Sequence, residues 1–249
     1  MPGPLSSSRP GGDRAVVLLD FDGPLCGLFA RRPAPAVAAV LLAVLRREGV
    51  VLPGAEDPHG LLARLPRALA ERGVRAGERG RLVELVDLTL TREEIAAARC
   101  AEPTLGAAAA VVALAGAGVR LGVVSNNARA AVEEYLPRVG LAEHLAKHVV
   151  GRPGDPALMK PDPGGIREAL RGLGVGEGET GGCVYIGDTP TDAAAAHAAG
   201  VRFLGWTGGS ALRRERLIAS GVAGNNLFDA WSTLFETESS MSKSVITAR

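Results

Sequence analysis

An apolar run that ends in two closely spaced carboxylates limits the possible folds of this chain more than any other feature. Residues 15–19 read Ala-Val-Val-Leu-Leu, and Asp20-Phe21-Asp22-Gly23 follows directly. A short run of this kind, bounded by charge and glycine, indicates a strand buried in a parallel sheet. Open α/β sheets place their chemistry at the carboxyl ends of such strands. The sequence therefore predicts a functional site at Asp20 and Asp22.

The two carboxylates can be interpreted in two ways. Burying like charges one residue apart is costly unless a cation or a reaction offsets their repulsion. In a catalytic site, one aspartate attacks a substrate or binds metal while the other transfers a proton. In the plainer interpretation, the strand simply ends in a solvated Asp-x-Asp-Gly turn.

Three further segments make the catalytic interpretation the better one. Their polar residues are Ser125 and Asn126 after an apolar run at 119–124, Lys160 in a loop with two prolines, and Asp188 and Asp192 after an apolar run at 183–186. Each segment alone is weak, because hydroxyls, lysines and Gly-Asp pairs end many strands. In this order they resemble the four signature motifs of the haloacid dehalogenase-like (HAD) superfamily of hydrolases. The resemblance covers about residues 14–235 and is strongest to the phosphatase branch with a helical cap, the phosphoglycolate phosphatase-like group.

This resemblance implies that Asp20 is the nucleophile and Asp22 the general acid/base. A carboxylate is ionised at neutral pH and forms an aspartyl-phosphate that water then opens. Asp22 protonates the leaving oxygen and later activates the water, and in this family its backbone carbonyl also binds the metal. Gly23 allows a sharp exit from the strand that a β-carbon would obstruct. Pro24 replaces the usual Thr or Val of the family, which removes a backbone N–H but deletes no catalytic group.

The resemblance also implies how the phosphoryl group is held. The Ser125 hydroxyl and the Asn126 backbone N–H donate to phosphoryl oxygens, and Lys160 neutralises the crowded negative charge as a point charge. Each role has a plainer alternative. Ser125 could simply end a strand or cap the next helix, and Lys160 could lie in a solvated loop.

A metal site follows from the same resemblance, with Mg²⁺ as the expected cofactor. Asp188 is implied to bind the metal directly, and Asp192 either binds it through water or holds Lys160. An N-cap role for Asp192 is compatible with both. Together with Asp20 and the carbonyl of Asp22, these residues make a hard oxygen site that suits Mg²⁺, which would bridge nucleophile and phosphate.

Periodicity predicts an α/β fold, a Rossmann-like three-layer sandwich with a parallel sheet, plus an inserted all-helical block that resembles the cap domain of the family. The predicted parts are a disordered N-terminal tail at 1–13, a core at 14–25 and 104–236, the cap at 26–103, and a C-terminal tail at 237–249 to which we assign no role. Helices are expected in the cap at 36–47, 61–71, 78–90 and 92–99, with Thr91 as the N-cap of the last one. In the core, helices are expected at 104–117, 128–139, 163–172, 192–199 and 226–236, and strands at 15–20, 119–125, 148–150, 183–187 and 202–206.

Composition narrows the class of protein. With 249 residues and a net charge of +1, the chain can bury a core but offers no electrostatic case for binding nucleic acid or an anionic membrane. It contains no apolar stretch of about 18 residues, and its N-terminus lacks a secretion signal. The three cysteines lack metal-ligand spacing, so we expect a reduced cytoplasmic protein with small buried thiols. Four scattered histidines are expected to have surface or packing roles: His59, His144, His148 and His197.

The leading hypothesis is a Mg²⁺-dependent phosphatase acting on a small phosphorylated metabolite. Dehalogenases of the family lack the second aspartate, so the presence of Asp22 argues against that activity. Phosphonate hydrolases of the family use a lysine in the cap, and residues 24–103 contain no lysine, which argues against that activity too. A phosphomutase of the β-phosphoglucomutase type and a non-catalytic regulatory module remain as alternatives. A phosphorylated signalling receiver fits less well, because receivers carry the acceptor aspartate after a later strand and have no cap. The sequence predicts neither the substrate nor the oligomeric state. Four cap arginines are candidates for specificity: Arg31, Arg32, Arg64 and Arg67.

Overall fold

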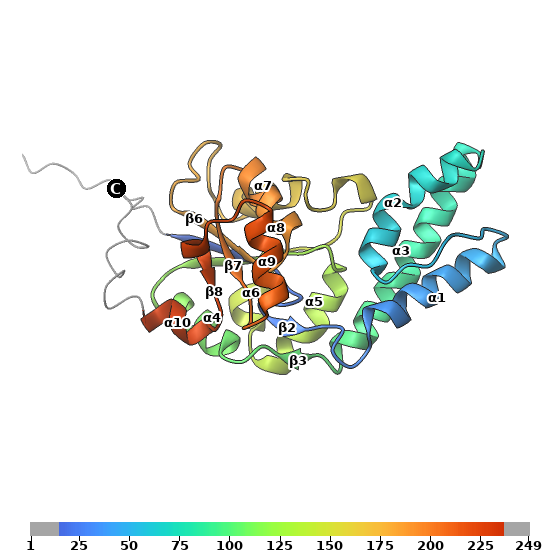
Figure 1. Cartoon of the computed structure of the whole chain (residues 1–249). Helices are drawn as coiled ribbons and strands as arrows, with labels where there is room; N and C mark the ends of the chain where they lie inside the picture. Colours follow the sequence, from blue (N-terminus) through green and yellow to red (C-terminus); the bar gives the residue numbers. More distant parts are fainter. Residues whose placement is uncertain (1–14, 237–249) are drawn as a thin grey trace, which may run out of the picture.

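The computed structural model describes residues 15–236 and contains a six-stranded parallel sheet (Figure 1). Its strands run in the order β5-β4-β1-β6-β7-β8, and every neighbouring pair is parallel. They are β1 (Val16–Leu19), β4 (Arg120–Val124), β5 (Val149–Val150), β6 (Cys183–Gly187), β7 (Arg202–Trp206) and β8 (Leu227–Phe228). The expected tails at 1–13 and 237–249 lie outside the described residues.

The sheet separates the apolar core into two layers, and the residues of the central strand β1 contribute to both. Val17 and Leu19 pack on one face of the sheet, and Val16 and Leu18 pack on the other, because successive strand residues point to opposite faces. The first layer contains α4 (Ala107–Gly116), α5 (Arg129–Tyr135), α6 (Ala142–Leu145) and α10 (Trp231–Glu236); the second contains α7 (Gly164–Gly172), α8 (Pro190–Ala198) and α9 (Ala211–Ala219). Short 3₁₀ turns lie at Leu136–Val139, Ala146–His148, Pro156–Leu158 and Gly224–Asn226. The predicted three-layer α/β fold is confirmed.

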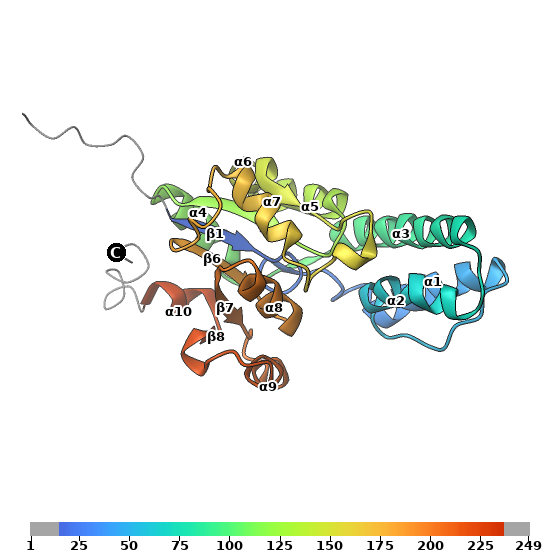
Figure 2. The ribbon, with the colours of Figure 1, turned by 90° about the horizontal axis from the view of Figure 1, so that it is seen from above.

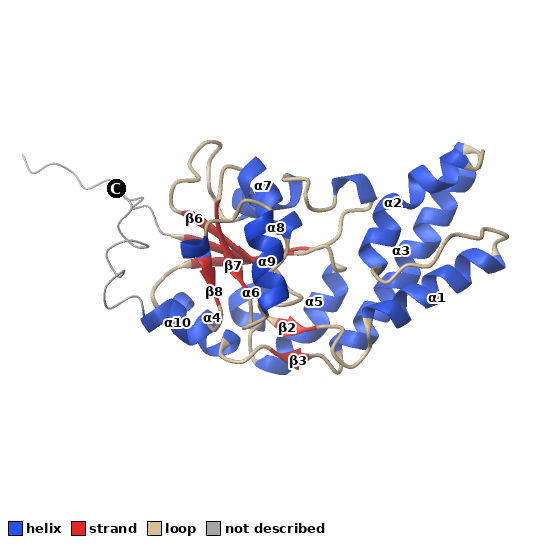
Figure 3. Ribbon diagram, in the orientation of Figure 1, coloured by secondary structure: helices blue, strands red, loops and turns tan. Residues whose placement is uncertain are grey.

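A separate helical block, which we call the cap, lies beside the sheet (Figures 2 and 3). It consists of α1 (Ala34–Arg47), α2 (Pro58–Glu71) and α3 (Ala76–Ala98), and has its own apolar core of leucines and valines. An antiparallel ribbon of β2 (Cys26–Gly27) and β3 (Glu102–Pro103) joins it to the sheet domain. Sequence periodicity did not predict these two-residue strands.

The cap contains one long helix where we predicted two. Thr91 does not cap a new helix but lies within α3. Leu82, Val86, Leu90 and Glu94 are all buried at four-residue spacing, so one continuous face packs inward. The Thr-x-x-Glu pattern was misleading because the Glu94 carboxylate accepts hydrogen bonds from other parts of the chain.

Three further expectations need correction. The helix predicted at 226–236 is β8 followed by the shorter α10, because Leu227 and Phe228 pair with the edge of the sheet. Helices α6 and α9 were not predicted. Cys26 and Cys183 are buried as expected, whereas Cys100 is exposed.

Candidate active site

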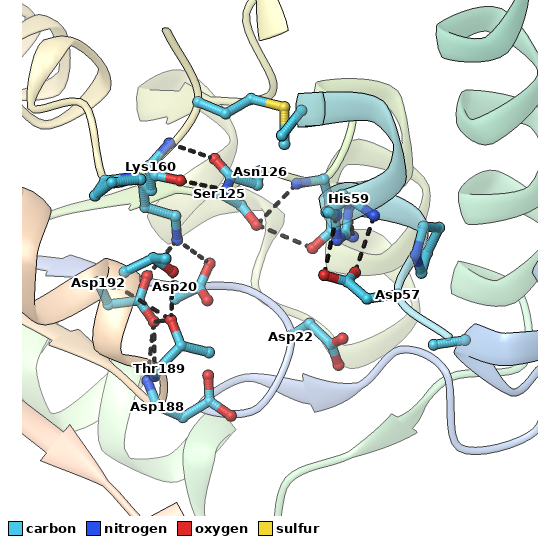
Figure 4. Close-up of a pocket in the computed structure, with 18 of the residues that line it drawn as sticks. Asp20, Asp22, Asp57, His59, Ser125, Asn126, Lys160, Asp188, Thr189 and Asp192 are labelled. Atoms are coloured by element: carbon cyan, nitrogen blue, oxygen red, sulfur yellow. Dashed lines mark hydrogen bonds and ion pairs between the residues drawn. The ribbon is translucent and has the colours of Figure 1, made fainter. Parts of the chain in front are cut away.

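The predicted site residues meet in one cavity at the carboxyl ends of β1, β4 and β6 (Figure 4). The cavity has a volume of about 530 Å³. All seven candidates from the sequence line it: Asp20, Asp22, Ser125, Asn126, Lys160, Asp188 and Asp192. The parallel sheet brings these distant segments together because its strands end at one edge.

Asp20 is the first residue after β1 and is buried. Its backbone N–H donates to the Ile186 carbonyl at 2.8 Å, which continues the pairing with β6. Its Oδ1 lies 2.9 Å from Lys160 Nζ, an ion pair without hydrogen-bond alignment, and accepts no hydrogen bond from the described residues. Burial raises the pKa of Asp20, while the charge of Lys160 opposes that rise. Its carboxylate is therefore poised to gain a further positive partner.

Asp22 is held by the segment that leads into the cap. Its Oδ1 accepts a hydrogen bond from the Leu28 backbone N–H at 2.8 Å. Burial raises the pKa of Asp22 to about 6, although that hydrogen bond opposes the shift. Gly23 has a φ of 109°, and a β-carbon there would lie 2.5 Å from Asp188 Oδ2. The turn that places Asp22 therefore requires glycine.

Lys160 lies at the centre of the charge cluster. Its Nζ is 2.6 Å from Asp192 Oδ1 and donates to the Tyr185 hydroxyl at 2.7 Å. Burial alone would lower the pKa of Lys160, but Asp192 and Asp20 outweigh it and raise the pKa. The lysine thus stays charged next to Asp20.

Asp192 is fully buried and satisfies two of the roles considered for it. Its Oδ1 pairs with Lys160, and its Oδ2 accepts hydrogen bonds from the backbone N–H groups of Asp188 and Thr189. Together with the Thr189 side chain this forms a capping box at the start of α8. With both oxygens engaged in this way, Asp192 is better placed to hold Lys160 than to bind a metal directly.

Ser125 and Asn126 follow β4 and line the cavity. The Ser125 hydroxyl donates to Asn127 Oδ1 at 3.0 Å. The Asn126 side chain bonds the backbone of Lys160 in both directions, donating to its carbonyl at 3.2 Å and accepting from its N–H at 2.9 Å. These contacts hold the lysine loop against the end of β4.

Asp188 has a partner that sequence reasoning missed. Arg213 Nε lies 2.9 Å from Asp188 Oδ2, and its guanidinium lies over the Trp206 ring at 4.7 Å. Burial and the neighbouring Asp192 and Asp20 nevertheless raise the pKa of Asp188 well above its ordinary value. The site therefore concentrates more negative charge than its own cations balance.

The acidic cluster fits a hard divalent cation. Carboxylate oxygens of Asp20, Asp188 and Asp192 lie within 4.8 Å of one another. Asp20 Oδ1 accepts no hydrogen bond from the described residues, and the pKa values of Asp20 and Asp188 are raised by burial and by neighbouring carboxylates, so a bound cation would stabilise their ionised forms. Carboxylate oxygens are the ligands that Mg²⁺ prefers.

The cap contributes one group that we expected to be unimportant. His59, at the start of α2, lines the cavity and bonds buried Glu94 at 2.8 Å. The preceding Asp57 and Pro58 start the helix earlier than predicted, through hydrogen bonds to Asp57. The Asp-Pro pair could have indicated from the sequence that the helix begins at residue 58 and therefore includes His59. Among the described residues that line the cavity, none of the four candidate arginines is present: Arg31, Arg32, Arg64 and Arg67.

Comparison with known proteins identifies the family. The family model described as haloacid dehalogenase-like hydrolase matches residues 15–200. The chain belongs to this family. This HAD-like hydrolase is 32% identical over 198 residues to a protein from Cereibacter sphaeroides named phosphoglycolate phosphatase, covering 78% of this chain and 85% of that one. A Rhodospirillum rubrum protein of the same name is 44% identical over 97 residues, which are 39% of this chain and only 38% of that protein.

Solved structures share the fold of this HAD-like hydrolase. A predicted phosphatase from Clostridium acetobutylicum superposes with a TM-score of 0.63 at 19% identity, covering 91% of this chain and 99% of that one. A candidate β-phosphoglucomutase from Bacteroides vulgatus gives a TM-score of 0.65 at 20% identity, covering 95% of this chain and 92% of that one. Within residues 15–236, no helix has the length and apolar character needed to cross a membrane.

Proposed function

We propose that this hydrolase is a Mg²⁺-dependent phosphatase of a small phosphorylated metabolite, with 2-phosphoglycolate as the first ester to test. The observation that carries the proposal is the convergence of two carboxylates, a hydroxyl and a buried lysine on one cavity beside an acidic cluster. The names of the relatives point to the same chemistry. The cap, proposed to extend over residues 26–103, would cover this cavity.

In the first half of the reaction, a carboxylate oxygen of Asp20 attacks phosphorus in line with the ester oxygen. The bond from phosphorus to the ester oxygen breaks, and Asp22 gives that oxygen its proton, so an alcohol leaves and an aspartyl-phosphate remains. Ser125 and the Asn126 backbone N–H hold the phosphoryl oxygens, and Lys160 offsets their charge. A raised pKa of about 6 suits Asp22 to donate a proton near neutral pH.

In the second half, Asp22 takes a proton from a water molecule that attacks phosphorus. The bond from phosphorus to the Asp20 oxygen then breaks, which releases inorganic phosphate and restores the Asp20 carboxylate and the protonated Asp22. Asp20, Asp188 and the backbone carbonyl of Asp22 would hold the Mg²⁺ ion. Asp192 would not bind the ion directly but would hold Lys160 in place. When bound, the ion neutralises the repulsion between the nucleophile and the phosphate.

Phosphate release tests this proposal directly. Wild-type protein with Mg²⁺ is expected to release inorganic phosphate from 2-phosphoglycolate and from an activated aryl phosphate. Asp20→Asn should abolish release from both, because an amide is not a nucleophile. Asp155→Asn is the matched control, since Asp155 is an exposed N-cap and asparagine caps equally well. Release by Asp20→Asn within tenfold of wild type would contradict the role of Asp20.

A further inference from the structure

His59 is the cap residue whose position the proposed reaction does not explain. The cap wall of the cavity is otherwise formed by small or apolar residues such as Phe29, Ala34, Pro58 and Ala63, and by Asp57. Both carboxylate oxygens of Asp57 cap α2, accepting from the backbone N–H groups of His59 and Gly60 at 2.9 Å. Among the described cap residues that line the cavity, His59 is therefore the polar side chain that remains to contact a substrate.

The orientation of the imidazole ring follows from its partner. His59 Nε2 lies 2.8 Å from Glu94 Oε1. Burial raises the pKa of Glu94, but the hydrogen bond from His59 and the charge of Arg152 outweigh it, so the pKa lies below its usual value. Glu94 is then an ionised carboxylate that can only accept, and Nε2 must carry the proton. Asn127 Nδ2 donates to the same Oε1 at 3.1 Å.

This arrangement leaves the other ring nitrogen for a ligand. Within residues 15–236, Nδ1 of His59 makes no hydrogen bond to protein, and the side chain keeps 20% of its surface exposed while lining the cavity. Figure 4 shows His59 across the cavity from Lys160 and Asp192, which hold the phosphoryl end. A ring fixed by a buried carboxylate presents Nδ1 in one direction at little entropic cost.

We propose that Nδ1 of His59 binds the polar end of the leaving group, which makes His59 a specificity-determining residue. This inference rests on the proposed phosphatase function. The rest of the cap wall is mostly apolar, with contacts from residues such as Phe29, Pro58 and Ala63, so it fits a leaving group with a single polar end. Its far end carries either a hydroxyl, which donates to Nδ1 of the neutral ring, or a carboxylate, which accepts from Nδ1–H when the ring is a doubly protonated imidazolium.

Three esters of nearly equal size test the contact. 2-Phosphoglycolate, 2-hydroxyethyl phosphate and ethyl phosphate end in a carboxylate, a hydroxymethyl and a methyl group. We expect wild-type protein to show a higher kcat/KM for one or both polar esters than for ethyl phosphate. His59→Gln keeps a donor near Nε2 for Glu94 and removes Nδ1. It should lower kcat/KM for the preferred polar ester by about 10- to 100-fold, as for a lost hydrogen bond with a charged or strongly polar partner, and change ethyl phosphate by less than about threefold.

Two further variants keep the test decisive. His59→Asn retains a polar atom near the position of Nδ1 and should preserve more of the preference than His59→Gln. Arg67→Ala is the matched control on the same helix, since the Arg67 side chain is 86% exposed, pairs with Glu71 and does not line the cavity. It should leave kcat/KM for all three esters unchanged. Thermal unfolding of each variant would show that the fold is intact.

Several outcomes would overturn the inference. The first is a wild-type protein without preference for a polar ester, and the second is a His59→Gln variant that keeps the preference. The third is an equal fall in kcat/KM for all three esters in His59→Gln, which would indicate a structural role. Absence of phosphate release from every ester by wild-type protein would overturn the proposed function and this inference together. Release with an unchanged preference in the variant would overturn the inference alone.

Discussion

The buried contact between the cap and the core around Glu94 allows a quantitative prediction of stability. Glu94 has no exposed side-chain surface, and both of its oxygens lie 2.8 Å from Arg152 Nη1. It also accepts from the Ala128 backbone N–H at the start of α5 and from Asn127. Glu94→Ala removes all of these acceptors at once. Arg152, whose side chain is 2% exposed, would keep its pair with Asp87 but lose its main counter-charge.

Removing one partner of a buried ion pair costs about 3–5 kcal/mol, because the other charge is left without compensation. We expect the lower end, about 3 kcal/mol, since Asp87 still contacts Arg152. For a chain of this length, that corresponds to a fall of about 6–12 °C in the midpoint of thermal unfolding. Glu71→Ala removes the exposed i,i+4 pair with Arg67 on α2 and should cost less than about 0.5 kcal/mol.

Equilibrium unfolding in denaturant, followed by circular dichroism, measures both variants against wild type. The pH dependence supplies a second check. The pKa of Glu94 in the folded protein lies below its ordinary value of 4.5, so its contribution is present above pH 4.5 and is lost as the pH falls through the folded pKa. The difference between wild type and Glu94→Ala should therefore shrink in acid. A cost below about 1 kcal/mol at neutral pH, or a difference that grows in acid, would refute this reasoning.

Further predictions concern the charge cluster. Asp22→Asn should slow phosphate release by about two to four powers of ten, the usual contribution of a general acid/base, and a rate equal to wild type at every pH would contradict its role. Excess chelator should stop turnover and added Mg²⁺ should restore it; full activity in chelator would exclude the metal site. In calorimetric titrations with Mg²⁺, Asp188→Ala should weaken binding more than Asp192→Ala, and the reverse order would exchange their roles. Asp192→Asn should lower the unfolding midpoint more than Asp188→Asn does, because Asp192 pairs with buried Lys160 at 2.6 Å.

The location of the candidate site was predictable because its signals are local in the sequence. Asp20, Ser125 and Asp188 each follow a short apolar run, and a strand buried in a parallel sheet requires such a run whatever surrounds it. Asp20, Ser125 and Asp188 could therefore be assigned to strand ends, and the structure places all three in one cavity. Lys160 has no strand of its own and was located by its order among the motifs alone.

Only the tertiary structure decided the contacts between segments that are distant in the sequence. No local pattern brings Glu94 on α3 to Arg152 and His59, or Arg213 to Asp188. The same long-range contacts explain why α3 continues through Thr91, whose side chain accepts a hydrogen bond from Arg152 at 2.9 Å instead of starting a helix. By itself, the sequence determined the family, five of the six strands of the sheet and the candidate site residues, because burial of apolar strands and the order of motifs are properties of the chain. Which cap residue faces the substrate depends on packing across the cavity, and packing is settled only when the chain has folded.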